Sequence, residues 1–188
     1  MSKISKYQQN KLYYIHGYQS SPDSAKGTLF QKKLNATAIK YRDCKPEDLI
    51  ISECLKRISD IIKNDKVVVL IGSSLGGFLA VSTAINHSNV KKLILLNPAI
   101  IPPSTDIDKI QGLPRKIIED MIDKRLFANK IDAEITILRG TKDELVPDSW
   151  VLEFAKAQKA TVMLFNDDHM FSHNLAKLPD IISDILKQ

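Results

Sequence analysis

The sequence contains little cysteine and no long apolar run. Its 188 residues include two cysteines, Cys44 and Cys54, which are too few for a disulfide framework and stand near no metal-ligand pattern. No apolar stretch approaches the roughly 20 residues that a membrane-spanning helix needs. The polar segment from Met1 to Lys11 also lacks the apolar core of a secretory signal. We therefore expect reduced thiols, no membrane span and a cytoplasmic location.

Internal repeats, low-complexity tracts and concentrated charge are missing too. The chain carries 27 basic and 22 acidic residues, a formal net charge of +5, but the basic residues are scattered and cluster at most in pairs. Chains that bind nucleic acid concentrate their basic residues in a stripe or patch. We therefore expect no nucleic-acid partner, while an anionic substrate and the oligomeric state stay open. The length suits one domain over residues 1–188.

Short apolar runs alternate with longer amphipathic stretches, which is typical of βαβ units around a parallel sheet. The runs lack polar alternation, so we expect strands covered on both faces. The sequence thus predicts the α/β class, with a mostly parallel sheet of about six strands and helices on both faces. The expected strands are Lys11 to His16, Ala36 to Tyr41, Val67 to Ile71, Leu93 to Asn97, Ile135 to Arg139 and Val162 to Phe165. The expected helices are Pro22 to Leu34, Pro46 to Lys63, Leu75 to Asn86, Ser149 to Lys159 and Asn174 to Lys187.

The segment from Ile101 to Asp132 differs from the rest because it contains three prolines and one glycine, which interrupt regular structure. One amphipathic helix, Arg115 to Phe127, is expected inside it. Since the segment follows a strand, it can overhang the strand ends as a small cap over the site. A connecting helix that packs on the surface is the alternative.

Gly72-Ser73-Ser74-Leu75-Gly76-Gly77 directly follows the apolar run that ends at Ile71 and opens a helical stretch. A nucleophile elbow needs this arrangement, because the serine sits on a strained strand-to-helix turn that lifts its hydroxyl off the sheet edge. Glycines two residues on either side of Ser74 avoid collisions between strand and helix. The pattern predicts Ser74 as a nucleophile, and a plain Gly-Ser loop is the alternative.

A serine nucleophile needs a base, and the base needs an acid that orients it. In open parallel sheets such residues come from the carboxyl ends of strands. Asp143 and His169 each lie four residues after an expected strand, and the order Ser74, Asp143, His169 is that of the α/β-hydrolase fold. The other acids close to these loops, Glu144, Asp167 and Asp168, compete with Asp143.

The tetrahedral intermediate of acyl transfer needs backbone donors for its negative oxygen. We expect these donors to be the N–H groups of Leu75 and Tyr18, the latter in the loop after the first strand. We also expect Tyr18 and Phe78 to contact substrate. His16 is expected to order this loop rather than act as a base.

These residues together resemble the YqiA-like family of small bacterial esterases within the α/β-hydrolase superfamily. The motifs are HGYQSSPDSAKG at 16–27, GSSLGGF at 72–78, NPAIIP at 97–102, KDELV at 142–146 and DDHMF at 167–171. The resemblance implies ester or thioester hydrolysis with Ser74 as nucleophile, Asp143 as acid and His169 as base. Lys142 and the pair Asp167-Asp168 depart from the family pattern, and these departures leave the three triad positions intact.

The sequence therefore predicts a serine hydrolase of esters or thioesters that needs no cofactor or metal and forms an acyl-enzyme intermediate. A catalytically silent α/β-hydrolase fold that serves as a binding or scaffolding protein is the alternative. A nucleotide-binding Rossmann protein is excluded, because Ser74 stands where the dinucleotide fingerprint needs glycine and no Walker lysine follows.

Overall fold

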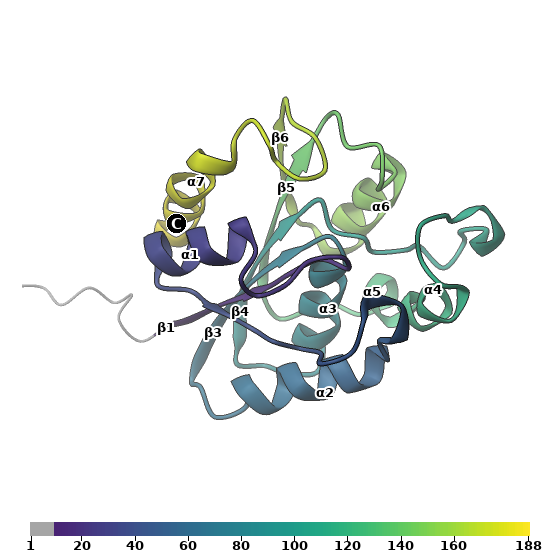
Figure 1. Ribbon diagram of the computed structural model, residues 1–188, viewed down its shortest axis with the longest axis horizontal. Coiled ribbons are helices and arrows are strands. Elements are labelled where there is room, and N and C mark those ends of the chain that lie inside the picture. The colour runs from purple at the N-terminus through teal and green to yellow at the C-terminus, as the bar shows by residue number, and fades with distance from the viewer. Residues whose placement is uncertain (1–9) are drawn as a thin grey trace, which may run out of the picture.

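The computed structural model describes residues 10–188, which form six parallel strands with helices on both faces (Figure 1). The strand order is β2-β1-β3-β4-β5-β6. The strands are β1 (Asn10–Ile15), β2 (Thr37–Ala38), β3 (Val67–Ser73), β4 (Val90–Leu96), β5 (Glu134–Gly140) and β6 (Thr161–Phe165). The expected parallel α/β architecture is confirmed. Residues 1–9, which hold most of the polar segment used to argue against a secretory signal, lie outside the described part.

Two helices cover one face of the sheet and the others lie on the opposite face. The helices are α1 (Ala25–Leu34), α2 (Ile51–Ile62), α3 (Leu75–Ala84), α4 (Arg115–Met121), α5 (Arg125–Ala128), α6 (Asp148–Gln158) and α7 (Leu178–Lys187). Figure 1 shows α1 and α7 together, and their side chains share one apolar cluster with β3 and β4. The second and larger cluster holds side chains of α2, α3, α4 and α6.

The central helix α3 is buried along its whole length, as expected from its apolar composition. The strand that leads into it, β3, is buried from Val68 to Ser73. Each fully buried Val, Leu or Ile side chain contributes about 1.5–3 kcal/mol relative to exposure. The turn between β3 and α3 is therefore held on both sides by well-packed elements.

The second strand is shorter than predicted. The sequence favoured a strand from Ala36 to Tyr41, but β2 pairs with β1 through Thr37 and Ala38 alone in the described part of the chain. Beyond Ala38 the chain still buries Ile39 and Tyr41, and the Tyr41 ring stacks on His16. The apolar run therefore reflects burial beside the sheet edge rather than continued strand pairing.

Two predicted helices are broken. The stretch from Pro46 divides into a 3-10 turn, Pro46–Asp48, and α2, because Leu49 and Ile50 adopt extended backbone. Leu49 is buried, so leaving the helix lets it reach the core.

The expected helix from Arg115 to Phe127 ends at Met121 and restarts as α5. At the break the Asp123 carboxylate accepts the backbone N–H of Arg125, a local hydrogen bond of the kind that competes with helix continuation. Three side chains of α4 are buried in the same cluster as α2. That the 101–132 segment caps the site stays a prediction.

The last strand, β6, lies at the sheet edge, so the expectation that both of its faces are covered is wrong. Leu164 is 68% exposed, and of the strands in residues 10–188 only β5 pairs with this one. An apolar run alone cannot separate a central strand from an edge strand, because strand order is decided by tertiary pairing. No helix in residues 10–188 is long and apolar enough to cross a membrane.

Candidate active site

Ser74 occupies the turn between β3 and α3 in a strained backbone conformation. Its φ of 55° and ψ of −119° lie in a region that side-chain-bearing residues rarely adopt. The flanking glycines are required by close packing: a Cβ atom on Gly72 would lie 2.7 Å from Gly77 Cα, and one on Gly76 would lie 2.6 Å from the His16 carbonyl oxygen. The local geometry is that of a nucleophile elbow.

Asp143 and His169 are joined by a hydrogen bond. The ring nitrogen Nδ1 of His169 lies 2.9 Å from Asp143 Oδ2, and the two side chains are 13% and 0% exposed. The other carboxylate oxygen, Oδ1, accepts the backbone N–H groups of Leu145 at 2.8 Å and Val146 at 3.1 Å. Burial by itself would raise the pKa of Asp143, but the His169 ring and these two N–H donors outweigh it and hold the pKa below its ordinary value.

The acids that competed with Asp143 have other surroundings. Glu144 is exposed, and Asp168 accepts the backbone N–H of Ser172 at 3.0 Å. Asp167 is buried but is engaged by N–H groups of its own loop. Of these acids, Asp143 alone is bonded to the His169 ring within residues 10–188.

Within the same residues, no hydrogen bond joins the Ser74 hydroxyl to the His169 ring. Both side chains follow strands of one parallel sheet, β3 and β6, at their carboxyl ends. Catalytic hydrogen bonds are often long in the unliganded state and tighten when substrate binds. The structure thus joins Asp143 and His169, the residues predicted to act as acid and base, and the contact between His169 and Ser74 stays a prediction.

The loop after β1 lies directly against Ser74. A Cβ atom on Gly17 would lie 3.4 Å from Ser74 Cβ and 4.0 Å from Ser74 Oγ. Arg42 holds this loop in place, because its Nη2 donates to the carbonyls of Tyr18 at 2.8 Å and Ser20 at 2.9 Å.

The two backbone N–H groups expected to bind an oxyanion are those of Tyr18 and Leu75. In the described part of the chain neither donates to another group. Tyr18 is partly buried at the margin of the larger core, while Phe78 is buried inside it at 1% exposure. Contact of these two side chains with substrate stays a prediction.

The other histidines have structural contacts. His16 is buried, its Nδ1 lies 2.9 Å from the Gly17 carbonyl, and its ring stacks on Tyr41 with centroids 4.3 Å apart. Burial lowers the pKa of His16 to about 4, so the ring is neutral at pH 7 and orders the loop as expected. His87 bonds the Ser59 hydroxyl at 2.9 Å.

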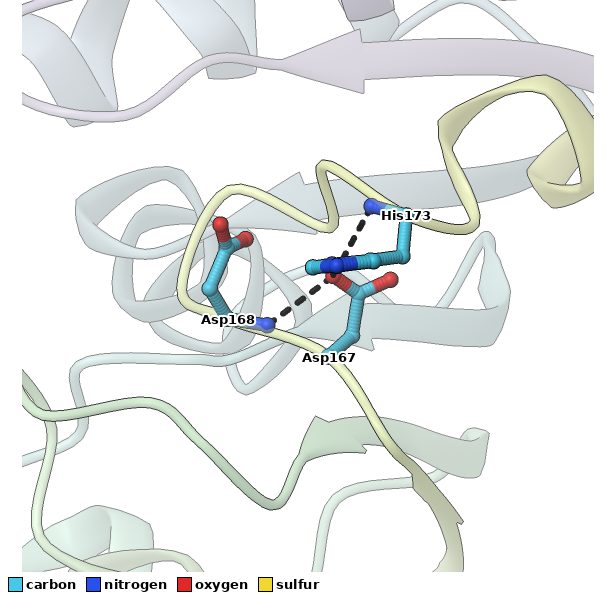
Figure 2. A group of neighbouring side chains, drawn as sticks. All are labelled: Asp167, Asp168 and His173. Carbon is cyan, nitrogen blue, oxygen red and sulfur yellow. Dashed lines mark hydrogen bonds and ion pairs between the residues drawn. The ribbon is translucent and has the colours of Figure 1, made fainter.

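Asp167, Asp168 and His173 place ligand-type atoms within 4.8 Å of one another (Figure 2). Figure 2 shows backbone N–H groups of Asp168 and His173 directed at the Asp167 carboxylate. Asn174 adds its backbone and side-chain N–H groups, both at 2.8 Å. Burial would raise the pKa of Asp167, but these donors lower it to about 2. The cluster anchors the loop that carries His169, and a cation would have to displace these bonds.

Sequence reasoning missed Arg139. This side chain is 4% exposed and its Nη1 lies 2.5 Å from Asp143 Oδ2, the oxygen that also accepts from His169. It also bonds the Val146 carbonyl at 2.7 Å and the exposed Asp148 carboxylate at 2.7 Å. The sequence signal that could have identified Arg139 is a charged residue at the end of an apolar strand. Such a residue is expected to be buried, and a buried charge needs a partner nearby.

The sequence pattern of one family, described as Uncharacterised protein family (UPF0227), matches residues 11–186. The chain belongs to this family. It is the YqiA family that the motifs indicated, so the expected resemblance is confirmed. Comparison with curated proteins finds no match.

Solved structures of similar fold extend the comparison. Est1E from Butyrivibrio proteoclasticus with ferulic acid bound has a TM-score of 0.76 and 21% identity, over 94% of this chain and 88% of that chain. Alpha/beta hydrolase domain-containing protein 10 from mouse has a TM-score of 0.72 and 19% identity, over 96% of this chain and 90% of that chain. A lipase-esterase related protein from Clostridium acetobutylicum has a TM-score of 0.70 and 17% identity, over 96% of each chain. This YqiA-family chain therefore has the α/β-hydrolase fold, as expected.

Proposed function

We propose that this protein is a serine hydrolase that cleaves carboxylic esters or thioesters through Ser74, His169 and Asp143. The observation that carries the proposal is the 2.9 Å hydrogen bond between His169 and the buried Asp143. The strained elbow at Ser74 supports it, because such strain is retained where a nucleophile must project from a sheet edge. A lipase-esterase related protein among the similar structures favours ester chemistry.

The reaction follows from the roles of these groups. His169 Nε2 takes the hydroxyl proton of Ser74 as Oγ attacks the acyl carbon, and Asp143 stabilises the resulting imidazolium. The N–H groups of Leu75 and Tyr18 bind the negative oxygen of the tetrahedral intermediate. The imidazolium then protonates the leaving alcohol or thiol, and an acyl group remains on Ser74. Water, deprotonated by His169, then attacks the acyl carbon, and the imidazolium returns this proton to Ser74 Oγ as the acyl–Oγ bond breaks and the acid is released.

Labelling with a fluorophosphonate probe, together with turnover of a panel of short-chain and long-chain p-nitrophenyl esters, tests the proposal. The wild-type protein should be labelled once, and Ser74→Ala should abolish labelling and lower turnover by at least about 10³-fold. Ser73→Ala, at the adjacent serine, is the matched control and should keep the label. An unlabelled wild-type protein with no turnover on any ester would favour the alternative, a catalytically silent binding or scaffolding protein.

A further inference from the structure

The turn that follows β4 begins with a buried residue in an unusual backbone conformation. Asn97 is fully buried and has a φ of 44°, a region that asparagine and glycine adopt more readily than other residues. Its backbone N–H donates to the Leu138 carbonyl of β5 at 3.0 Å. The backbone of this turn thus stays bonded to β5, and the Asn97 side chain lies at the end of the sheet.

The Asn97 amide connects the loops that carry the acid and the base. Its Nδ2 donates to the carbonyls of Asp168 and His169, each at 3.1 Å. Its Oδ1 accepts the backbone N–H of Gly140 at 2.8 Å and the guanidinium of Arg139 at 3.4 Å. Both donors and both acceptor sites of the amide are therefore in use.

The same turn also reaches the third loop. The backbone N–H of Ala99 donates to the carbonyl of Ser74 at 3.1 Å. Residues 97–99 are therefore hydrogen-bonded to the elbow, to the end of the strand that precedes Asp143, and to His169 itself. Three segments that are far apart in the sequence meet at this turn.

We propose that Asn97 is a positioning residue that fixes the His169 loop relative to the loops of Ser74 and Asp143. This inference rests on the proposed function. A base must come within hydrogen-bond reach of the proton it takes, about 2.6–3.2 Å between heavy atoms. A displacement of about 1 Å in such a constellation can cost about 10²-fold in rate. Asn97 acts through the backbone of His169 and takes no part in the bond changes.

Asn97→Asp and Asn97→Gly test the proposal. Aspartate keeps the shape and the tolerance of positive φ but replaces the two N–H donors with an acceptor that faces two carbonyls. Glycine keeps the backbone conformation and removes the bridge altogether. Both variants should lower kcat on a short-chain p-nitrophenyl ester by about 10²-fold, leave KM within about threefold, and slow labelling by a fluorophosphonate to a similar degree.

Asn89→Asp is the matched control at the other end of β4. The Asn89 Nδ2 likewise donates to two backbone carbonyls, those of Ile62 and Asp65, each at 2.9 Å. If the role of Asn97 were purely structural, the Asn97 variants and Asn89→Asp would all have lower melting temperatures. The kcat of the folded protein would then be unchanged in each.

The outcomes separate this inference from the proposed function. Turnover that survives Ser74→Ala would remove the proposed function itself. A labelled wild-type protein whose folded Asn97→Gly and Asn97→Asp variants react at the Asn89→Asp rate would overturn the positioning role alone. A kcat that stays low in both folded Asn97 variants at saturating substrate, with KM nearly unchanged, supports the positioning role.

Discussion

Arg139 lies 2.5 Å from Asp143 through its Nη1 and the carboxylate oxygen Oδ2. Both side chains are buried, at 4% and 0% exposure, and the same oxygen accepts the hydrogen bond of His169. One carboxylate therefore serves two partners, an arginine that is always charged and an imidazole that gains charge during the proposed reaction. Asp143 therefore takes part both in a buried ion pair that stabilises the fold and in the hydrogen bond that the proposed reaction uses.

Arg139→Gln should destabilise the fold strongly. The variant leaves Asp143 with its hydrogen-bond donors, the His169 ring and two backbone N–H groups, but without the arginine charge. Breaking a buried ion pair in this way typically costs about 3–5 kcal/mol in the free energy of unfolding. Arg57→Gln is the matched control, because Arg57 pairs with Asp43 at 44% and 56% exposure and solvent-exposed ion pairs contribute little to stability, so this variant should lose much less. Urea unfolding of both variants measures the difference, and equal losses would contradict the prediction.

Asp143→Asn should lower kcat by about 10³–10⁴-fold with little change in KM, because an amide neither stabilises the imidazolium nor fixes its tautomer. Glu144→Gln changes the adjacent exposed acid in the same way and should leave turnover within about twofold of wild type. Steady-state kinetics on one p-nitrophenyl ester compares the two. A larger loss in Glu144→Gln would assign the acid role to the neighbouring carboxylate.

Asp167→Asn should change how stability depends on pH. The folded-state pKa of Asp167, about 2, lies below its ordinary value of 3.8, so its carboxylate stabilises the fold above about pH 4 and this contribution is lost as the pH falls toward 2. The variant should be less stable at pH 7 and lose less on acidification. Asp184→Asn, on the exposed side of α7, should keep the wild-type dependence. Chemical unfolding between pH 2 and pH 7 provides the comparison, and identical curves for wild type and Asp167→Asn would rule out this anchor.

Sequence reasoning succeeded where the signal is local. The apolar run before Ser74, the glycines around it and the helical stretch after it are all contiguous, and β3, the turn and α3 follow this pattern. Chain order and strand ends placed Asp143 and His169 in loops at one edge of a parallel sheet, and the structure joins them by a hydrogen bond. Errors arose where distant contacts decide, as at the short β2, the break after Met121 and the exposed face of β6.

The sequence alone determined the α/β alternation, the elbow at Ser74 and the order of the proposed triad, because periodicity, glycine spacing and strand ends are properties of neighbouring residues. Only the tertiary structure decided that Arg139 shares the oxygen of Asp143 with His169 and that Asn97 bridges the loops on either side. Such contacts join residues up to 72 positions apart. Hydrogen bonds at that separation depend on how the strands pair and twist, and short-range sequence patterns carry no record of that pairing.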